Sequence, residues 1–436
     1  MDPLRSLRKT RKGQRTIDHW VTTRDLASVL ICVGSTIAVA ADWPHFLGPT
    51  HDGVSAETGL LETWPKDGPP IAWEMQTGET FAAPSIVAGK LILFHRVKDE
   101  EVVECLEATS GRKVWRFAYP TQYVDRYGYN GGPRAAPTIA EGRVYTYGAE
   151  GTLHALDFET GKALWDRDIK KEFKVPDNFF GVGSAPVIEG DRLLIAAGGA
   201  DGAGLLALAP STGKLLWKAS NQGASYATPY AATIRGKRRI VHFGKEGVVC
   251  VEAETGAVNW TYPFRSRTYE SVNAAGPVVS GNLVFASASY RTGAVLLRVS
   301  EDGSGVDEVW KNGVIGNHWA TSIIEGKYIY GFHGRHESEA VLKCIEFETG
   351  REMWARAGLG RGSMIRADGR TIILGERGRL VLAELTSTEP KILWFKPYLR
   401  HPCWTAPVLT DGLLYIRNQT RLICLDIRSK DGNSEP

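Results

Sequence analysis

This sequence lacks an excess of charge of either sign and, after its first 40 residues, lacks long apolar runs. Its 52 lysines and arginines nearly balance 49 aspartates and glutamates, which leaves a net charge of +3. Residues 1–40 contain seven of the basic and three of the acidic residues, so the rest of the chain is close to neutral. That balance gives no basis for binding nucleic acid or an anionic membrane surface through net charge. No later segment approaches 18 continuous apolar residues, so we expect no membrane span there.

Several motifs of enzyme and metal chemistry are also missing. The sequence has no G-x-S-x-G, no H-E-x-x-H and no D-x-D-x-D-G calcium loop. Long helical periodicity is absent, which argues against a nucleotide-binding α/β domain. Five cysteines follow residue 40, an odd number that argues against a disulfide framework. Cys105, Cys250 and Cys344 each precede a tryptophan by ten residues, and alanine takes the same place in other repeats, so we expect small buried core positions.

Residues 1–40 have the order of a secretory signal: a basic stretch, an apolar core from about Leu26 to Val39, and small residues around Ala38 and Ala40. An uncleaved N-terminal anchor is the alternative. We expect export to the periplasm or cell envelope, with membrane contact only through this leader if it is retained. Residues 41–70 are expected to form an N-terminal extension, and residues 431–436 a disordered tail.

The most informative feature that is present is an internal repeat. In five segments an acidic residue or alanine begins a turn, Ser or Thr precedes Gly, and Trp follows that Gly by four. The glycine supplies the positive φ that closes such a turn, and the chain then enters a strand. Three further tryptophans follow turns in which this motif is degraded. The repeat thus has eight tryptophans 40 to 52 residues apart, called the rungs below: Trp73, Trp115, Trp165, Trp217, Trp260, Trp310, Trp354 and Trp394.

This spacing suits four short strands per repeat and predicts an all-β, eight-bladed β-propeller over residues 71–430. The last repeat has no closing Trp, and Trp73 arrives before any inner strand. We therefore expect Ile71–Met75 to complete the final blade, so that an N-terminal strand closes the ring. The basic run from Arg235 to Arg239 falls where a hairpin turn is expected and predicts a solvated tip.

A functional site is expected at the channel mouth, where loops lead into the innermost strands. Those loops are rich in polar and aromatic residues that could bind a planar polar ligand or an extended peptide. The alternative is that they only fill and hydrate the channel. The candidate binding residues are Asn130, Arg134, Asn273, Asn317, His318, Trp319, Arg366 and Trp404. No pair of them has the spacing of an acid–base or nucleophile constellation, so no catalytic residue and no metal ligand is assigned.

The D-x-x-T-G-x-x-x-W repeat resembles the tryptophan-docking motif of the pyrroloquinoline-quinone-like (PQQ-like) propellers. This family includes quinoprotein alcohol dehydrogenases and the BamB-type outer-membrane assembly scaffold. The opening Trp43-Pro-His-Phe-Leu-Gly-Pro and the segment Gly132-Pro133-Arg134 look like the quinoprotein-like group of planctomycete-type bacteria. The resemblance implies an exported, monomeric, non-catalytic scaffold that binds an envelope protein or a small polar ligand at the channel mouth.

The alternative implied by the same resemblance is a PQQ-dependent alcohol or sugar dehydrogenase with the cofactor in the central channel. Trp319 or Trp404 would then stack on the quinone, and Arg134 or Arg366 would bind its carboxylates. Calcium would need a set drawn from Glu270, Asn273, Asn130 and Asn317. The vicinal Cys-Cys pair and the C-x-x-C-H haem motif of such enzymes are absent.

Overall fold

The computed structural model describes residues 42–429 apart from residue 178 and residues 269–271. The predicted leader and the predicted C-terminal tail lie outside the described residues. Within them, 32 strands form eight four-stranded antiparallel sheets, accompanied by one four-residue helix, α1 (Ile169–Glu172), and one 3-10 turn, η1 (Glu337–Glu339). No helix of this part of the chain is both long and apolar enough to cross a membrane.

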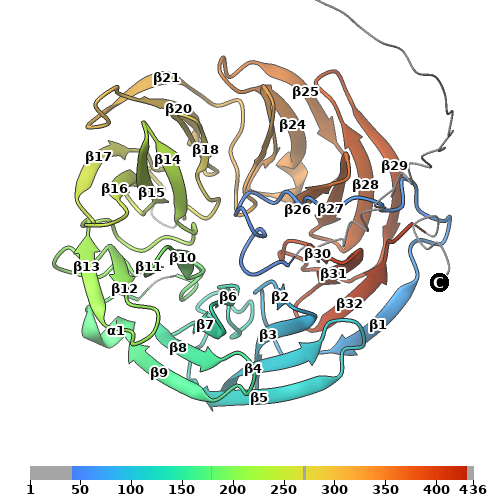
Figure 1. The fold of residues 1–436 in the computed structure, drawn as a ribbon. Coiled ribbons are helices and arrows are strands. Elements are labelled where there is room, and N and C mark those ends of the chain that lie inside the picture. Colours follow the sequence, from blue (N-terminus) through green and yellow to red (C-terminus); the bar gives the residue numbers. More distant parts are fainter. Residues whose placement is uncertain (1–41, 178, 269–271, 430–436) are drawn as a thin grey trace, which may run out of the picture. The chain divides into compact units, whose positions relative to one another are not determined.

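Seven of the sheets each contain four consecutive strands, with the first strand nearest the centre of the ring (Figure 1). In the first three blades these are β2 (Ser85–Val87), β3 (Lys90–Val97), β4 (Glu100–Glu107) and β5 (Lys113–Pro120); β6 (Thr138–Ala140), β7 (Arg143–Tyr147), β8 (Thr152–Asp157) and β9 (Ala163–Asp168); and β10 (Val187–Glu189), β11 (Arg192–Ala196), β12 (Leu205–Leu208) and β13 (Leu215–Ala219). In the next four they are β14 (Tyr230–Ile234), β15 (Lys237–Phe243), β16 (Gly247–Glu252) and β17 (Val258–Pro263); β18 (Val278–Ser280), β19 (Leu283–Ala288), β20 (Gly293–Val299) and β21 (Val306–Asn312); β22 (Ile323–Glu325), β23 (Tyr328–His333), β24 (Val341–Glu346) and β25 (Glu352–Ala357); and β26 (Gly362–Ala367), β27 (Arg370–Gly375), β28 (Arg379–Leu385) and β29 (Pro390–Pro397).

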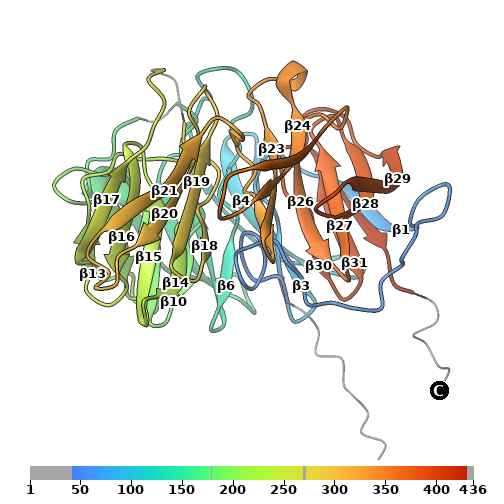
Figure 2. The same ribbon diagram turned by 90° about the horizontal axis from the view of Figure 1, so that it is seen from above.

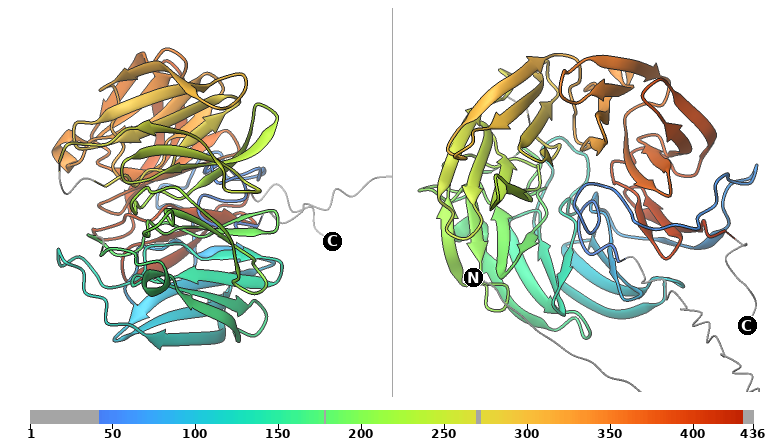
Figure 3. Two further views of the ribbon diagram at one scale, coloured as in Figure 1. Left: turned by 90° about the vertical axis from the view of Figure 1, so that its left-hand side faces the viewer. Right: turned by 45° about the horizontal axis from the view of Figure 1, so that its top comes forward.

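The eighth blade combines strands from both ends of the described chain: β30 (Val408–Thr410), β31 (Leu413–Arg417), β32 (Arg421–Asp426) and β1 (Ile71–Gln76). β1 pairs antiparallel with β32, and Trp73 lies opposite Cys424. This pairing agrees with the strand predicted at Ile71–Met75 and leaves the last blade with four strands. The right view of Figure 3 shows the blades following one another around the axis. The protein therefore folds as the predicted all-β, eight-bladed β-propeller.

Burial explains why the strands differ in sequence pattern. β4 is buried from Glu101 to Leu106, because neighbouring blades cover both faces of the middle strands. β9, at the rim, alternates between exposed and half-buried residues, as expected for a strand with one face in water. The predicted buried position of Cys105, Cys250 and Cys344 is confirmed: each is a buried free thiol, and each lies directly opposite a rung tryptophan in the next strand.

The tryptophan rungs connect one blade to the next. The indole Nε1 of Trp73 donates to the Ala108 carbonyl in the following blade at 2.8 Å, and five other rungs make the equivalent bond. The Trp73 ring also lies on Gly111, the turn glycine of that blade, where a Cβ would come within 2.8 Å of Trp73 Cε3. The glycine is therefore needed for two reasons, its positive φ and the ring that covers it.

The rung at Trp260 is an exception, because its indole nitrogen is buried without a hydrogen-bond partner among the described residues. The next blade has the degraded turn, and Arg239 donates there to the Gly303 carbonyl instead. Arg239 is only 1% exposed. The solvated tip predicted for this basic run is therefore wrong at Arg239, which is an interblade contact.

Residues 42–57, called the floor segment below, cross one end of the central channel (Figures 1 and 2). Hydrogen bonds attach this segment to the inner strands or turns of the first, second, seventh and eighth blades. They join Trp43 to Ile86, Pro44 to Ile139, Gly53 to Arg366, and Glu57 to Gly412, all at 2.7–2.8 Å. The floor segment therefore lies across the end of the channel opposite the mouth.

Candidate ligand pocket at the channel mouth

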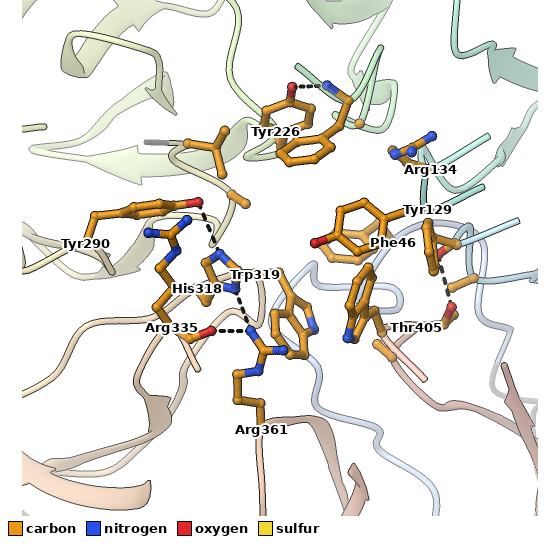
Figure 4. Close-up of a pocket in the computed structure, with 18 of the residues that line it drawn as sticks. Phe46, Tyr129, Arg134, Tyr226, Tyr290, His318, Trp319, Arg335, Arg361 and Thr405 are labelled. Atoms are coloured by element: carbon orange, nitrogen blue, oxygen red, sulfur yellow. Dashed lines mark hydrogen bonds between the residues drawn. The ribbon is translucent and has the colours of Figure 1, made fainter. Parts of the chain in front are cut away.

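The mouth contains a cavity of about 330 Å³ (Figure 4). Its walls are largely aromatic, and the described residues that line it include basic side chains but no aspartate or glutamate. The aromatic residues are Phe46, Phe81, Tyr129, Phe180, Tyr226, Tyr290, Trp319 and Trp404, and the basic residues are Arg134, Arg335 and Arg361 with His318 and His336. Phe46 comes from the floor segment and the others from loops of different blades.

The aromatic side chains contact one another across blade boundaries. The ring centroids of Trp319 and Trp404 are 5.8 Å apart, and those of Tyr129 and Trp404 are 5.2 Å apart. Phe81 lies 5.0 Å from Trp404 on its other side. The Trp319 indole nitrogen is buried and has no hydrogen-bond partner among the described residues. The pocket therefore offers apolar surface together with an unused donor, a combination typical of ligand sites.

Arg361 is the most heavily bonded cation of the pocket. Its Nε and Nη2 donate to the two carboxylate oxygens of the buried Glu376, at 2.9 and 2.5 Å. Its Nη1 donates to the Arg335 carbonyl and lies 3.1 Å from His318 Nδ1. The guanidinium lies 4.6 Å from the centre of the Trp319 ring. Burial acts to raise the pKa of Glu376, but the bonds from Arg361 outweigh it and the pKa is lowered.

His318 is held in its neutral form. Arginine can only donate, so the contact with Arg361 makes Nδ1 of His318 the acceptor and leaves the ring proton on Nε2, 3.3 Å from Tyr290 Oη. Burial, followed by the positive charges of Arg361 and Arg335, lowers the pKa of His318 to about 3. Burial is thus the main cause of the lowered pKa of His318, and the neighbouring positive charges add to it.

The other two arginines differ in how far they are neutralised. Arg134 donates to the buried carboxylate of Asp125 at 2.5 Å and to the Gly132 carbonyl at 2.9 Å. The guanidinium of Arg335 lies 4.4 Å from the centre of the Tyr290 ring and makes no ion pair within the described part of the chain. Among the described residues, Arg335 is thus the arginine of the pocket that has no acidic partner.

Four of the residues predicted from sequence line this pocket: Arg134, His318, Trp319 and Trp404. Their role in binding a cofactor stays a prediction. Three Asn residues are buried and hold backbone groups: Asn130 accepts from the Gly132 nitrogen, Asn273 donates to the Gly244 carbonyl, and Asn317 donates to the Phe332 carbonyl.

Arg366 lies elsewhere than the sequence predicts. It was expected among the mouth residues, but its backbone is bonded to the floor segment and its side chain pairs with Glu325. The reason is that β26 begins at the mouth with Gly362 and ends at the floor with Ala367. Arg361, just before this strand, reaches the pocket instead.

Arg335 and Tyr290 were missed because they lie in loops between the second and third strands of their blades. In an antiparallel blade the chain runs from mouth to floor in the first strand and returns in the second. The loops after second strands therefore share the mouth with the loops that precede first strands. The up-and-down order of the predicted strands therefore already implied that these loops lie at the mouth.

The family resemblance implies a site for quinone and calcium at this mouth, and such a site needs side chains that can hold the metal. No group of three or more His, Cys, Asp or Glu side chains able to hold a metal occurs in the described ranges. Glu270, one of the proposed calcium ligands, lies outside them. The carboxylates nearest the pocket, Asp125 and Glu376, are bound to arginines, and the side-chain oxygens of Asn130 and Asn317 already accept hydrogen bonds. The described residues therefore do not form a complete site for a calcium-held quinone.

Comparison with known families decides the relationship. A family model described as outer membrane protein assembly factor BamB matches residues 99–356, more than half of the chain. The protein belongs to this family. BamB from Burkholderia pseudomallei is 26% identical over 267 residues, which cover 59% of this chain and 64% of that relative.

Solved structures of the BamB family and of quinoproteins share the fold. BamB from Moraxella catarrhalis aligns with a TM-score of 0.60 at 14% identity, covering 84% of this chain and 99% of that one. The quinohemoprotein alcohol dehydrogenase of Comamonas testosteroni aligns with a TM-score of 0.64 at 13% identity, covering 91% and 82%. At sequence identities this low, the structural similarity shows only that the fold is shared.

Proposed function

We propose that this BamB-family protein is an exported scaffold of the cell envelope that binds a partner protein at the mouth of its propeller. Membership of the family supports a role in assembly, since the curated relatives are named as outer membrane protein assembly factors. Export is supported by the signal-like order of residues 1–40. The near-neutral charge of the remaining chain supports a protein partner over nucleic acid.

The observation that carries this proposal is a group of exposed and half-buried apolar and aromatic side chains beside the pocket. We call it the mouth crest and define it as Val124, Tyr127, Tyr129, Phe179 and Phe180. The exposed fractions are 80% for Val124, 46% for Tyr127 and 50% for Tyr129. Large apolar side chains gathered at such exposure mark surfaces that bind other proteins.

The crest is continuous with the pocket. The Tyr127 and Phe180 rings are 5.2 Å apart, and Tyr129 contacts both Phe180 at 6.0 Å and Trp404 at 5.2 Å. Phe180 is further positioned by its backbone nitrogen, which donates to Tyr226 Oη at 2.9 Å. A partner covering the crest would therefore also reach the cavity.

Photo-crosslinking in cells tests this function. A photoreactive amino acid replaces Val124 in one variant and Phe395, a 60% exposed side chain of the rim strand β29, in a matched control. We expect a discrete adduct with an envelope protein from position 124 and none from position 395. Equal adducts from both positions, or none from position 124, would contradict the proposed docking at the mouth.

The dehydrogenase alternative is tested separately. The purified protein is mixed with PQQ and calcium, and bound-quinone absorbance and dye reduction with alcohols or sugars are measured. We expect neither signal at micromolar cofactor, because the acidic groups near the pocket already bind arginines. Stoichiometric quinone binding with dye reduction would refute the scaffold proposal as stated.

A further inference from the structure

The charge distribution of the pocket favours an anion. Among the described residues, three arginines and no acidic side chain line it. Asp125 and Glu376 neutralise Arg134 and Arg361, but within the described residues the guanidinium of Arg335 has no counter-ion. A carboxylate, like a phosphate, matches a planar guanidinium through two parallel hydrogen bonds, and every protein chain ends in a carboxylate.

The surroundings of Arg335 prepare it for such a partner. Its guanidinium lies 4.4 Å from the Tyr290 ring centre, and its carbonyl accepts from Arg361, so both side chain and backbone are held. Trp319 adds the buried indole donor that is without a partner in the described chain. These groups come from different blades yet line the same cavity (Figure 4).

The shape of the cavity limits what can carry that carboxylate. The floor segment crosses the far end of the channel, and Phe46 of this segment forms part of the pocket wall, so a chain that enters from the mouth meets this segment. The end of an extended chain is narrower than an α-helix, which is about 10–12 Å wide with its side chains, and it can enter the cavity from the mouth.

We propose that the pocket binds the C-terminal end of an extended segment of the partner protein. The terminal carboxylate pairs with Arg335, and an aromatic or aliphatic last side chain packs against Trp319 and Trp404. The residues that precede the terminus cover the mouth crest. This inference rests on the proposed scaffold function and names the part of the partner that enters the site.

Two synthetic peptides test the inference. Both have the sequence acetyl-Gly-Ser-Gly-Ser-Tyr-Phe; one ends in a free carboxylate and the other in an amide. Binding to the purified protein is measured by calorimetry. We expect the amide to bind at least about tenfold more weakly, since a hydrogen bond to a charged group contributes that much.

Two substitutions assign the effect to the pocket. Arg335→Gln removes the unpaired cation and should weaken the free-acid peptide by at least about tenfold while leaving the amide unchanged. Arg377→Gln makes the same change of charge at a 71% exposed side chain that pairs with Glu337, and it should leave both peptides unaffected. Equal losses in the two variants would mean a general charge effect and would overturn the inference.

The remaining outcomes separate this inference from the scaffold function. If the acid and amide peptides bind equally, or neither binds, while the crosslink from position 124 persists, the chain-end site is refuted and the scaffold stands. If phenylpropionate or PQQ binds in an Arg335-dependent way and the peptide does not, the pocket takes small acids and the inference is also refuted. Loss of both peptide binding and the crosslink would refute both proposals.

Discussion

The contact of Trp73 with Gly111 allows a sharp test of what holds neighbouring blades together. Gly111 has a φ of +69°, and a Cβ there would lie 2.8 Å from Trp73 Cε3. Gly142 has nearly the same φ, +70°, but a Cβ there would meet no atom within 4 Å. Gly111→Ala and Gly142→Ala therefore share the backbone strain and differ in the ring contact.

The expected magnitudes follow from these two terms. An alanine held in the left-handed region costs about 1–2 kcal/mol in either variant. Gly111→Ala must also displace the Trp73 ring, which adds about 1–3 kcal/mol of overpacking and endangers the bond to Ala108, worth about 1 kcal/mol. We expect Gly111→Ala to be less stable than Gly142→Ala by about 2–4 kcal/mol.

Thermal unfolding measures this difference. With an unfolding entropy of about 2.1 cal/mol/K per residue, 1 kcal/mol shifts the midpoint of a chain of this size by about 1 °C. The midpoint of Gly111→Ala should therefore lie about 2–5 °C below that of Gly142→Ala. Combining Gly111→Ala with Trp73→Ala should cost less than the sum of the single changes, because both remove one contact. Equal midpoints for the two glycine variants would refute the docking argument.

Two other predictions concern buried basic groups. Arg239→Ala should destabilise the protein by about 2–4 kcal/mol, because it leaves a cavity and an unpaired Gly303 carbonyl. The control Arg238→Ala removes an ion pair whose arginine side chain is 48% exposed, and it should cost less than about 1 kcal/mol. Urea unfolding of the two variants measures the difference. His45 and His51 stack at 3.6 Å in the floor segment, and burial above all lowers their pKa values to about 3 and about 4. As the pH falls, histidines of the unfolded chain are protonated before the buried histidines of the folded chain. The stability that comes from keeping His45 and His51 neutral is therefore full above pH 6.5 and is lost as the pH falls toward 4 and 3. A His45→Phe/His51→Phe variant should lose less stability between pH 7 and pH 4 than the parent, and an unchanged slope would contradict this assignment.

The eight blades could be predicted because each repeat carries its own local signals. A turn glycine, a tryptophan and short apolar runs lie within one repeat and need no knowledge of distant contacts. The ring contact between blades could not be predicted in the same way, since Trp73 bonds Ala108, 35 positions further along the chain. Arg239 shows the same limit: its basic neighbours suggest a solvated loop, yet a degraded turn in the next blade gives it a buried carbonyl.

The repeat pattern also allows a prediction of which loops line the candidate pocket. Loops before the first strand of a blade gave Arg134 and Trp404, and the loops after second strands, which antiparallel pairing places at the same mouth, contain Tyr290 and Arg335. What sequence could not decide is which arginine keeps its charge available. Asp125, nine positions before Arg134, and Glu376, 15 positions after Arg361, neutralise two of them through loop conformations that no repeat pattern encodes. The repeat thus locates the mouth, and only the pairing of its acids with its arginines singles out Arg335 as the group that we propose to contact an anionic partner.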